Sequence, residues 1–252
     1  GAVMGSKNIK AILIKGTQET KVSQPKELNA LAEKLRTSAT RGPMTAQNRD
    51  QGTVGGLAAY NLLGMVGTHN FLEGYFDPIN LNLNGKVLNE EWTIEKVSCP
   101  NCVVNCHPLV QVPDSHSAYG GIEVTVDIQH VFSFGSATGC SDWPTILKCI
   151  QLCDDLGMDP ISCGVTASMA CELYEVGIIT ESDLGYALPF GSEANLVRFV
   201  RELGLHQNFA GKMFGDGSRI AGLRLEGPGK EDPSYYGMHI KGLELPLFDL
   251  HG

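Results

Sequence analysis

The sequence predicts a mainly α protein: a multihelical domain with a short N-terminal strand and a loop-rich segment that carries clustered cysteines. Apolar residues recur at helical spacing in three stretches of the second half of the chain, and a glycine follows each stretch. A short apolar run near the N-terminus is typical of a strand. Residues 41–90, by contrast, are rich in glycine and asparagine and predict irregular structure with one short helix near residues 57–63.

The first half of the chain contains few predicted regular elements. Residues 10–15, with the sequence Lys-Ala-Ile-Leu-Ile-Lys, form a short apolar run and predict a buried strand. Over residues 25–36, three leucines and an alanine share one helical face, and Ser23 is a candidate cap. Alternating apolar residues predict a further strand over residues 122–128.

Three helices are predicted in the second half. They cover residues 143–156, 161–176 and 193–204, and glycines mark their ends. Four of the eight cysteines lie on the apolar stripes of the first two helices, so core packing is favoured for them over metal binding. These four are Cys149, Cys153, Cys163 and Cys171.

Composition restricts the class of protein. The chain has 252 residues, of which 42% are hydrophobic, and this suits one large domain or two small ones. Its formal net charge of −9 argues against nucleic acid or an anionic membrane surface as a partner. No apolar run is long enough to span a bilayer, and the N-terminus lacks the pattern of a signal peptide. We therefore expect free or metal-bound thiols in a reducing cytoplasm.

Three cysteines lie close together in the sequence, at Cys99, Cys102 and Cys106. Soft sulfur ligands grouped in this way select zinc or an iron–sulfur cluster. Pro100 and Pro108 favour a loop, which suits a ligand segment better than a helix does. A [4Fe–4S] cluster needs four cysteines, so one ligand is missing locally. The alternative is that these residues are buried apolar side chains or disulfide partners.

The second informative feature is the acidic turn, residues 154–159, with the sequence Asp-Asp-Leu-Gly-Met-Asp. Asp154 and Asp155 fall in the last turn of a predicted helix, where the negative end of the helix dipole disfavours a carboxylate by about 0.3–1 kcal/mol. A solvated helix face is one explanation. The other is a ligand with several N–H donors, such as a pterin or guanine edge, held by a carboxylate at the helix end.

In their order along the chain, these motifs resemble the tungsten-containing aldehyde:ferredoxin oxidoreductase family. Residues 1–12 are similar to its GAVMGSKNLKAI segment and residues 241–246 to its KGLE(L/I)P segment. Gly52-Thr53 and Asn70-Phe71 fall where the family has its GT and NF pairs. The clustered cysteines match the first three of its cluster motif. The acidic turn matches its DxxGLD pterin-binding motif, with methionine in place of leucine.

The resemblance implies an enzyme that oxidises an aldehyde to a carboxylate, with oxygen from water, at tungsten (or molybdenum) held by two pterins. Electrons would pass through a [4Fe–4S] cluster to ferredoxin. Cys99, Cys102 and Cys106 would be cluster thiolates. The residues that would hold the pterin are Asp154, Leu156, Gly157, Met158 and Asp159.

The resemblance also implies a catalytic role for Glu123, which falls where the family has a glutamate near the tungsten. A desolvated carboxylate there, with a raised pKa, could move the proton from water or the hydrated aldehyde. The alternative, given equal weight, is an outward-facing residue on an alternating strand. One departure from the family is that Lys148 and Gln151 replace an ExxH motif that binds a metal between subunits in some members, so that metal is not expected.

Family members are more than twice as long, so the resemblance implies an internal piece of a longer enzyme. Residues 1–20 would be the end of an N-terminal β domain that binds pterin. Residues 21–252 would form a helical middle domain that runs into the start of a C-terminal helical domain. Those flanking domains would be partners of this chain, and the isolated piece would be inactive, with the cluster and the tungstopterin not necessarily bound.

A different function stays open on the residues alone. The chain could be a non-catalytic zinc-binding or interaction module, in which Cys140 or His107 completes a Cys₃X site with the clustered cysteines. The substrate also stays open, because related members reduce aromatic thioesters or act on keto-aldehydes.

Overall fold

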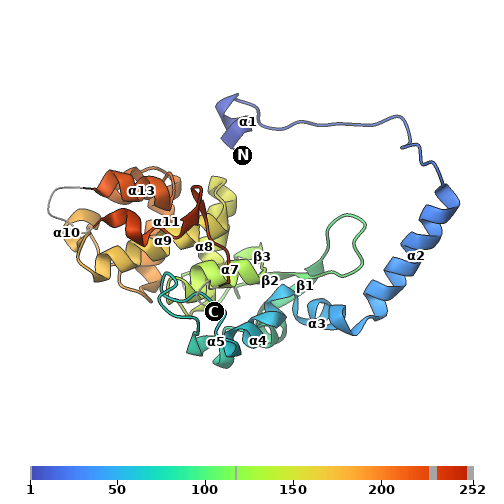
Figure 1. Ribbon diagram of the computed structural model, residues 1–252, viewed down its shortest axis with the longest axis horizontal. Helices are drawn as coiled ribbons and strands as arrows, with labels where there is room; N and C mark the ends of the chain where they lie inside the picture. The colour runs from blue at the N-terminus through green and yellow to red at the C-terminus, as the bar shows by residue number, and fades with distance from the viewer. Residues whose placement is uncertain (1, 117, 227–231, 249–252) are drawn as a thin grey trace.

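The computed structural model describes residues 2–116, 118–226 and 232–248, which form a helical body with a small antiparallel sheet beside it (Figure 1). The predicted mainly α class is confirmed. No helix among the described residues is long and apolar enough to cross a membrane. The longer helices are α2 (Pro25–Arg41), α3 (Pro43–Gln51), α8 (Trp143–Leu156), α9 (Pro160–Glu175), α11 (Glu193–Gly204) and α13 (Ser218–Leu225).

Shorter helical pieces connect these elements. The α-helical ones are α1 (Ala2–Ser6), α4 (Leu57–Leu62), α5 (Asp77–Leu81), α6 (Gly85–Val87), α7 (Ile128–Val131), α10 (Glu181–Leu184) and α12 (Asn208–Phe214). Two are 3₁₀ turns, η1 (Thr53–Gly56) and η4 (Pro233–Tyr236), and two are π-helical, η2 (Leu88–Trp92) and η3 (Phe132–Ser136). Residues 43–92 are therefore more helical than predicted, and the short helix expected near residues 57–63 is α4.

Residues 2–24 form an arm that is separate from the body and is joined to it through α2 (Figure 1). The strand predicted over residues 10–15 is wrong: this segment is extended but pairs with no described strand, and Leu13 is 98% exposed. A strand needs a neighbour for its backbone hydrogen bonds, and the described part of the chain provides none at this place. Helix α2 has Gln24, not Ser23, as its N-cap, and none of its residues is buried.

The antiparallel sheet supports the cysteine loop, residues 98–106. Its strands are β1 (Thr93–Val97), β2 (His107–Gln111) and β3 (Glu123–Thr125), in that order. Val97 lies opposite His107, so the loop that joins β1 to β2 projects from one end of the sheet. The strand predicted over residues 122–128 is shorter than expected, because Asp127 caps the start of α7. A second hairpin pairs β4 (His239–Ile240) with β5 (Leu243–Glu244).

Helix α9 is the centre of the body. Its residues from Cys163 to Leu173 are all buried, and it packs against α8, α11, α13 and β5. The three helices predicted in the second half are confirmed, with ends within one residue of the predicted bounds. The four cysteines predicted to pack in the core are buried, namely Cys149, Cys153, Cys163 and Cys171.

Candidate functional site

The acidic turn joins α8 to α9, and short-range interactions fix its backbone. Gly157 takes a left-handed conformation, with φ 70°, and its amide and that of Met158 both donate to the Cys153 carbonyl. Asp159 then caps α9, because its Oδ2 accepts a hydrogen bond from the Ser162 amide at 2.8 Å. Hydrogen bonds to α8 and to α9 thus fix the two ends of the turn, and Asp159 Oδ1 remains available to a ligand.

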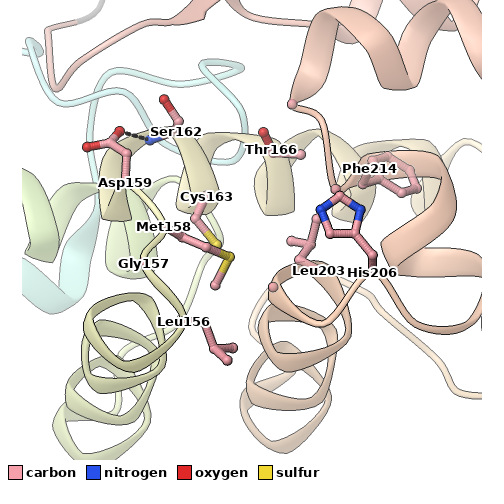
Figure 2. A pocket seen from close by; sticks show the side chains of 13 residues that line it. Leu156, Gly157, Met158, Asp159, Ser162, Cys163, Thr166, Leu203, His206 and Phe214 are labelled. Atoms are coloured by element: carbon pink, nitrogen blue, oxygen red, sulfur yellow. Dashed lines mark hydrogen bonds between the residues drawn. The ribbon is translucent and has the colours of Figure 1, made fainter. Parts of the chain in front are cut away.

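A cavity of about 320 Å³ lies between the acidic turn and the segment that runs from the end of α11 to α13 (Figure 2). The first wall comes from the turn and the start of α9, through Leu156, Gly157, Met158, Asp159, Ser162, Cys163 and Thr166. The opposite wall consists of Leu203, Gly204, His206, Phe214, Gly215 and Gly217. The cavity therefore combines apolar side chains with a carboxylate, two hydroxyls and an imidazole.

Four of the five residues predicted to hold a pterin line this cavity, and Asp154 does not. Asp154 and Asp155 are exposed on the last turn of α8 and have no hydrogen bond or ion pair with any described residue. The described chain therefore contains nothing that offsets their unfavourable position at the negative end of the helix dipole.

The opposite wall was not predicted from the sequence. It approaches the acidic turn closely, because a Cβ on Gly204 would lie 2.6 Å from Leu156 Cδ1. It is held from behind by the buried Glu244, whose Oε1 accepts from the Ser218 amide at 2.8 Å and from its hydroxyl at 2.9 Å. A Cβ on Gly217 would lie 2.8 Å from the same oxygen. The glycines of residues 204–217 were the available signal for such close packing.

The cysteine loop places three thiols near one another. Cys99 and Cys102 are exposed, Cys106 is half-buried, and the Cys102 amide donates to the Cys99 carbonyl at 3.0 Å. Burial raises the pKa of the Cys106 thiol; the neighbouring Cys102, Cys99 and Asp127 raise it further, and a backbone hydrogen bond opposes them. The Cys106 thiol is therefore within electrostatic reach of the two other cysteines of the loop.

The GT pair anchors this loop to the body. Gly52 has φ 66°, and a Cβ there would lie 2.9 Å from the Cys106 carbonyl oxygen and 2.8 Å from Pro108 Cδ. A side chain at this position would push against the end of the cysteine loop. Thr53 Oγ1 accepts a hydrogen bond from the Ile128 amide at 3.0 Å, which links η1 to the start of α7.

Within the described ranges, no group of three or more His, Cys, Asp or Glu side chains is arranged to hold one metal ion. This arrangement does not favour the zinc module, which requires Cys140 or His107 to converge with the clustered cysteines on a single ion. Burial also raises the pKa of the Cys140 thiol to about 12. The ligands of a [4Fe–4S] cluster need not converge in this way, because each cysteine binds a different iron atom.

Glu123 lies on β3 apart from the cavity and is exposed. Its Oε1 accepts a hydrogen bond from Gln111 Nε2 at 3.0 Å, and both of its sequence neighbours are buried. Within the described part of the chain it is an outward-facing residue on an alternating strand. The burial expected of a proton-transfer group is not provided by the described residues.

Comparison with known proteins decides the family. Residues 30–252 match the model of the aldehyde ferredoxin oxidoreductase family, domains 2 and 3. The chain belongs to this family. It is 28% identical over 255 residues to the tungsten-containing aldehyde ferredoxin oxidoreductase of Pyrococcus furiosus, and 26% identical over 255 residues to that of Thermococcus kodakarensis. Each alignment covers 100% of this chain and 40% of the relative, so the chain spans about 40% of the length of these proteins.

Two further proteins are similar to the chain. The aliphatic sulfonate oxidoreductase WOR-like subunit of Pyrococcus furiosus is 28% identical over 247 residues, covering 97% of this chain and 39% of the relative. A solved structure, the active site complex BamBC of benzoyl coenzyme A reductase with 1,5-dienoyl-CoA, superposes with a TM-score of 0.70. It is 20% identical and covers 98% of this chain and 38% of that chain, so the likeness shows the fold alone.

Proposed function

We propose that this chain is the part of a tungstopterin oxidoreductase that oxidises aldehydes to carboxylates and passes electrons through a [4Fe–4S] cluster to ferredoxin. The observation that supports this function best is the cavity beside the acidic turn. A segment that matches the family's pterin-binding motif forms one wall of a cavity of about 320 Å³. That volume is at the lower end of the range of small-molecule sites, about 300–1,000 Å³.

The residues of the cavity fit a flat heterocycle with polar edges. Leu156, Met158 and Phe214 offer apolar surface for the faces of the ring. A Cβ at Gly157 would meet nothing within 4 Å, so there is open space beside the backbone of the turn. Asp159 Oδ2 accepts from the Ser162 amide, which leaves Oδ1 to accept from a ring N–H. A tungstopterin bound here supplies the redox chemistry at the aldehyde carbon.

Asp154 would hold the pterin from the end of α8. Its carboxylate is exposed and has no partner among the described residues. A ligand with N–H donors would give it charge-assisted hydrogen bonds and offset the repulsion from the helix dipole. Asp155, its neighbour, is equally exposed but falls outside the motif. The two aspartates therefore form a matched pair for experiment.

The oxidation of an aldehyde to a carboxylate determines how many protons and electrons the protein must transfer. An aldehyde and one water give a carboxylate, three protons and two electrons. Ferredoxin takes electrons singly, so the two electrons leave one after the other. Glu123 is the candidate in this chain for accepting a proton, because its Oε2 has no partner while Oε1 is bonded to Gln111. We expect flanking segments of the longer enzyme to bury this carboxylate.

The cysteine loop would supply three thiolates of the cluster, and a fourth cysteine would come from elsewhere in the longer enzyme. Anaerobic incubation of the chain with ferrous iron and sulfide tests this proposal. We expect iron and sulfide to bind in amounts that fall sharply in the Cys99→Ser, Cys102→Ser and Cys106→Ser variants. Cys171→Ala, which removes a buried thiol of α9, is the matched control and should leave iron binding unchanged.

The catalytic proposal is tested by aldehyde oxidation in a polypeptide that carries this sequence together with the flanking domains. Residues 1–20 would then complete an N-terminal β domain, and the exposure of residues 5–20 in this structure supports that assignment. We expect tungsten, iron and aldehyde-dependent ferredoxin reduction in that protein, and neither tungsten nor ferredoxin reduction in the 252-residue chain alone. Robust activity of the isolated chain would contradict the need for flanking domains. A longer protein without tungsten and without aldehyde oxidation would contradict the function.

A further inference from the structure

A second cavity, of about 570 Å³, lies apart from the acidic turn. We call it the aromatic–acidic cavity. Its walls come from the loop before α5, from α9, and from η4 together with Met238. Two carboxylates line it, and no lysine, arginine or histidine does so among the described residues. The lining residues are Asn70, Phe71, Leu72, Glu73, Gly74, Glu172, Tyr235, Tyr236 and Met238.

Glu172 of α9 is the buried acidic group of this cavity. The residue is 8% exposed, and its Oε2 accepts a hydrogen bond from Asn70 Nδ2 at 2.6 Å. Its other oxygen, Oε1, has no hydrogen-bond partner among the described residues. Burial raises the pKa of the Glu172 carboxyl, and the hydrogen bond from Asn70 opposes that change. Because Glu172 lines the cavity, this second oxygen is open to it and can accept a charge-assisted hydrogen bond from a ligand.

Asn70 holds this carboxylate in a fixed position. Its Oδ1 accepts from the Ser168 hydroxyl at 2.9 Å, and its Nδ2 also donates to the Tyr236 carbonyl at 2.9 Å. The backbone around it is strained, because the three consecutive residues 69–71 have positive φ angles of 48°, 56° and 66°. These hydrogen bonds tie two segments of the chain, α9 and η4, to the side-chain amide of Asn70. The acidic group is therefore ordered before any ligand arrives.

Two tyrosine rings complete the cavity. The rings of Tyr235 and Tyr236 lie 5.5 Å apart at an angle of 89°, so they form two perpendicular faces. Aromatic faces attract cations through their quadrupole, and the attraction is stronger where the site is desolvated. The cavity is too large for a bare metal ion, and the described residues offer no set of three ligands for one. Ring faces and a buried carboxylate suit an alkylammonium or guanidinium group.

We propose that the aromatic–acidic cavity binds the ammonium or guanidinium group of an organic cation, which donates a hydrogen bond to Glu172 Oε1 while its carbon atoms pack on Tyr235 and Tyr236. This binding site is separate from the acidic turn and does not depend on the function proposed above. Glu73, at the rim, is exposed, and its Oε1 lies 3.3 Å from His69 Nδ1. It adds long-range attraction and little specific affinity.

The test is a titration of the 252-residue chain, labelled with ¹³C on its methionine methyl groups, with n-butylammonium and n-butylguanidinium. Met238 lines the aromatic–acidic cavity, and Met158 lines the other cavity and serves as an internal reference. We expect a saturable shift of the Met238 resonance and none of Met158. Neutral butyramide and anionic butyrate, which have a similar size, should leave Met238 unchanged.

Two variants on α9 distinguish the contribution of the Glu172 carboxylate to binding from an effect of charge removal on the fold. Glu172→Gln keeps an oxygen that can accept from Asn70, removes the charge, and should weaken binding at least about tenfold. Glu175→Gln removes the same charge from an exposed position of the same helix and should bind as the parent does. Equal shifts with butyramide, or unchanged affinity in Glu172→Gln, would overturn the proposal.

A second set of ligands in the same titration identifies the source of the cation. Nα-acetyl-lysine amide and Nα-acetyl-arginine amide present the same groups as side chains of a polypeptide. Binding as tight as that of the simple cations assigns the cavity to a basic side chain of a partner or flanking segment. Binding of the simple cations alone assigns it to a small amine. Either result supports the organic-cation site, and no binding of any cation refutes it.

Discussion

Replacing the two motif aspartates of the acidic turn by alanine should change stability in opposite directions. Asp159→Ala removes the N-cap of α9, in which Oδ2 accepts from the Ser162 amide at 2.8 Å. Loss of such a cap costs about 0.5–2 kcal/mol. Loss of a negative charge at a helix N-terminus adds about 0.3–1 kcal/mol. We expect a total destabilisation of about 1–3 kcal/mol.

Asp154→Ala should instead stabilise the chain. The residue lies in the last turn of α8 and has no hydrogen bond or ion pair with a described residue, so the substitution removes no stabilising contact. It removes a negative charge from the negative end of the helix dipole, which gains about 0.3–1 kcal/mol. Alanine also has the higher helix propensity, by at most about 0.7 kcal/mol. The expected gain is about 0.5–1.5 kcal/mol.

The assay is urea unfolding followed by circular dichroism at low ionic strength, because salt screens the dipole contribution. Asp159→Ser keeps a capping oxygen and is the control, with a loss smaller than that of Asp159→Ala. The two alanine variants should move the unfolding midpoint to opposite sides of the parent. A destabilised Asp154→Ala would refute the reasoning, because it would mean that the carboxylate makes a stabilising interaction within the chain.

Three further outcomes are expected. Gly164→Ala should destabilise the chain by about 1–3 kcal/mol in urea unfolding, because its Cβ would lie 2.5 Å from the Ser133 carbonyl oxygen, whereas Gly204→Ala meets only the mobile ends of Leu156 and Met158 and should cost less. Iodoacetamide at about pH 8, followed by mass spectrometry, should modify Cys99 and Cys102 first and Cys140 hardly at all, because burial raises the pKa of Cys140 to about 12; rapid labelling of Cys140 would contradict the buried position. Because burial raises the pKa of Glu172, its protonated form is favoured in the folded state, so its contribution to stability is present at low pH and is lost as pH rises through the folded pKa. The stability of Glu172→Gln relative to the parent should therefore increase between about pH 4 and pH 7 in urea titrations, and a decrease would show the sign to be wrong.

The helices of the second half could be predicted because their signals are local. Apolar residues at helical spacing predicted these helices, and Gly157 ends α8 in the left-handed conformation that a terminal glycine favours. Such signals depend only on residues a few positions apart. The strand expected over residues 10–15 failed for the opposite reason, because strand formation depends on a partner, and the described chain has none there.

Only one wall of the candidate site could be predicted from the sequence. The acidic turn is contiguous in sequence, whereas the opposite wall depends on how residues 203–217 pack against it. The aromatic–acidic cavity was not predicted at all, because Asn70 and Glu172 are 102 positions apart. The sequence marked Asn70 as part of a family motif, but its chemical role appears only once the fold brings it to α9.

The central claim is that the acidic turn holds a tungstopterin, and the most direct measurement is the tungsten and pterin content of two matched variants. They are Asp154→Asn and Asp155→Asn, made in a polypeptide that carries this sequence with its flanking domains and purified without oxygen. Both residues are exposed neighbours at the end of α8, but only Asp154 belongs to the motif. We predict that Asp154→Asn loses most of its tungsten and pterin while Asp155→Asn keeps both. Equal retention in the two variants would contradict the claim.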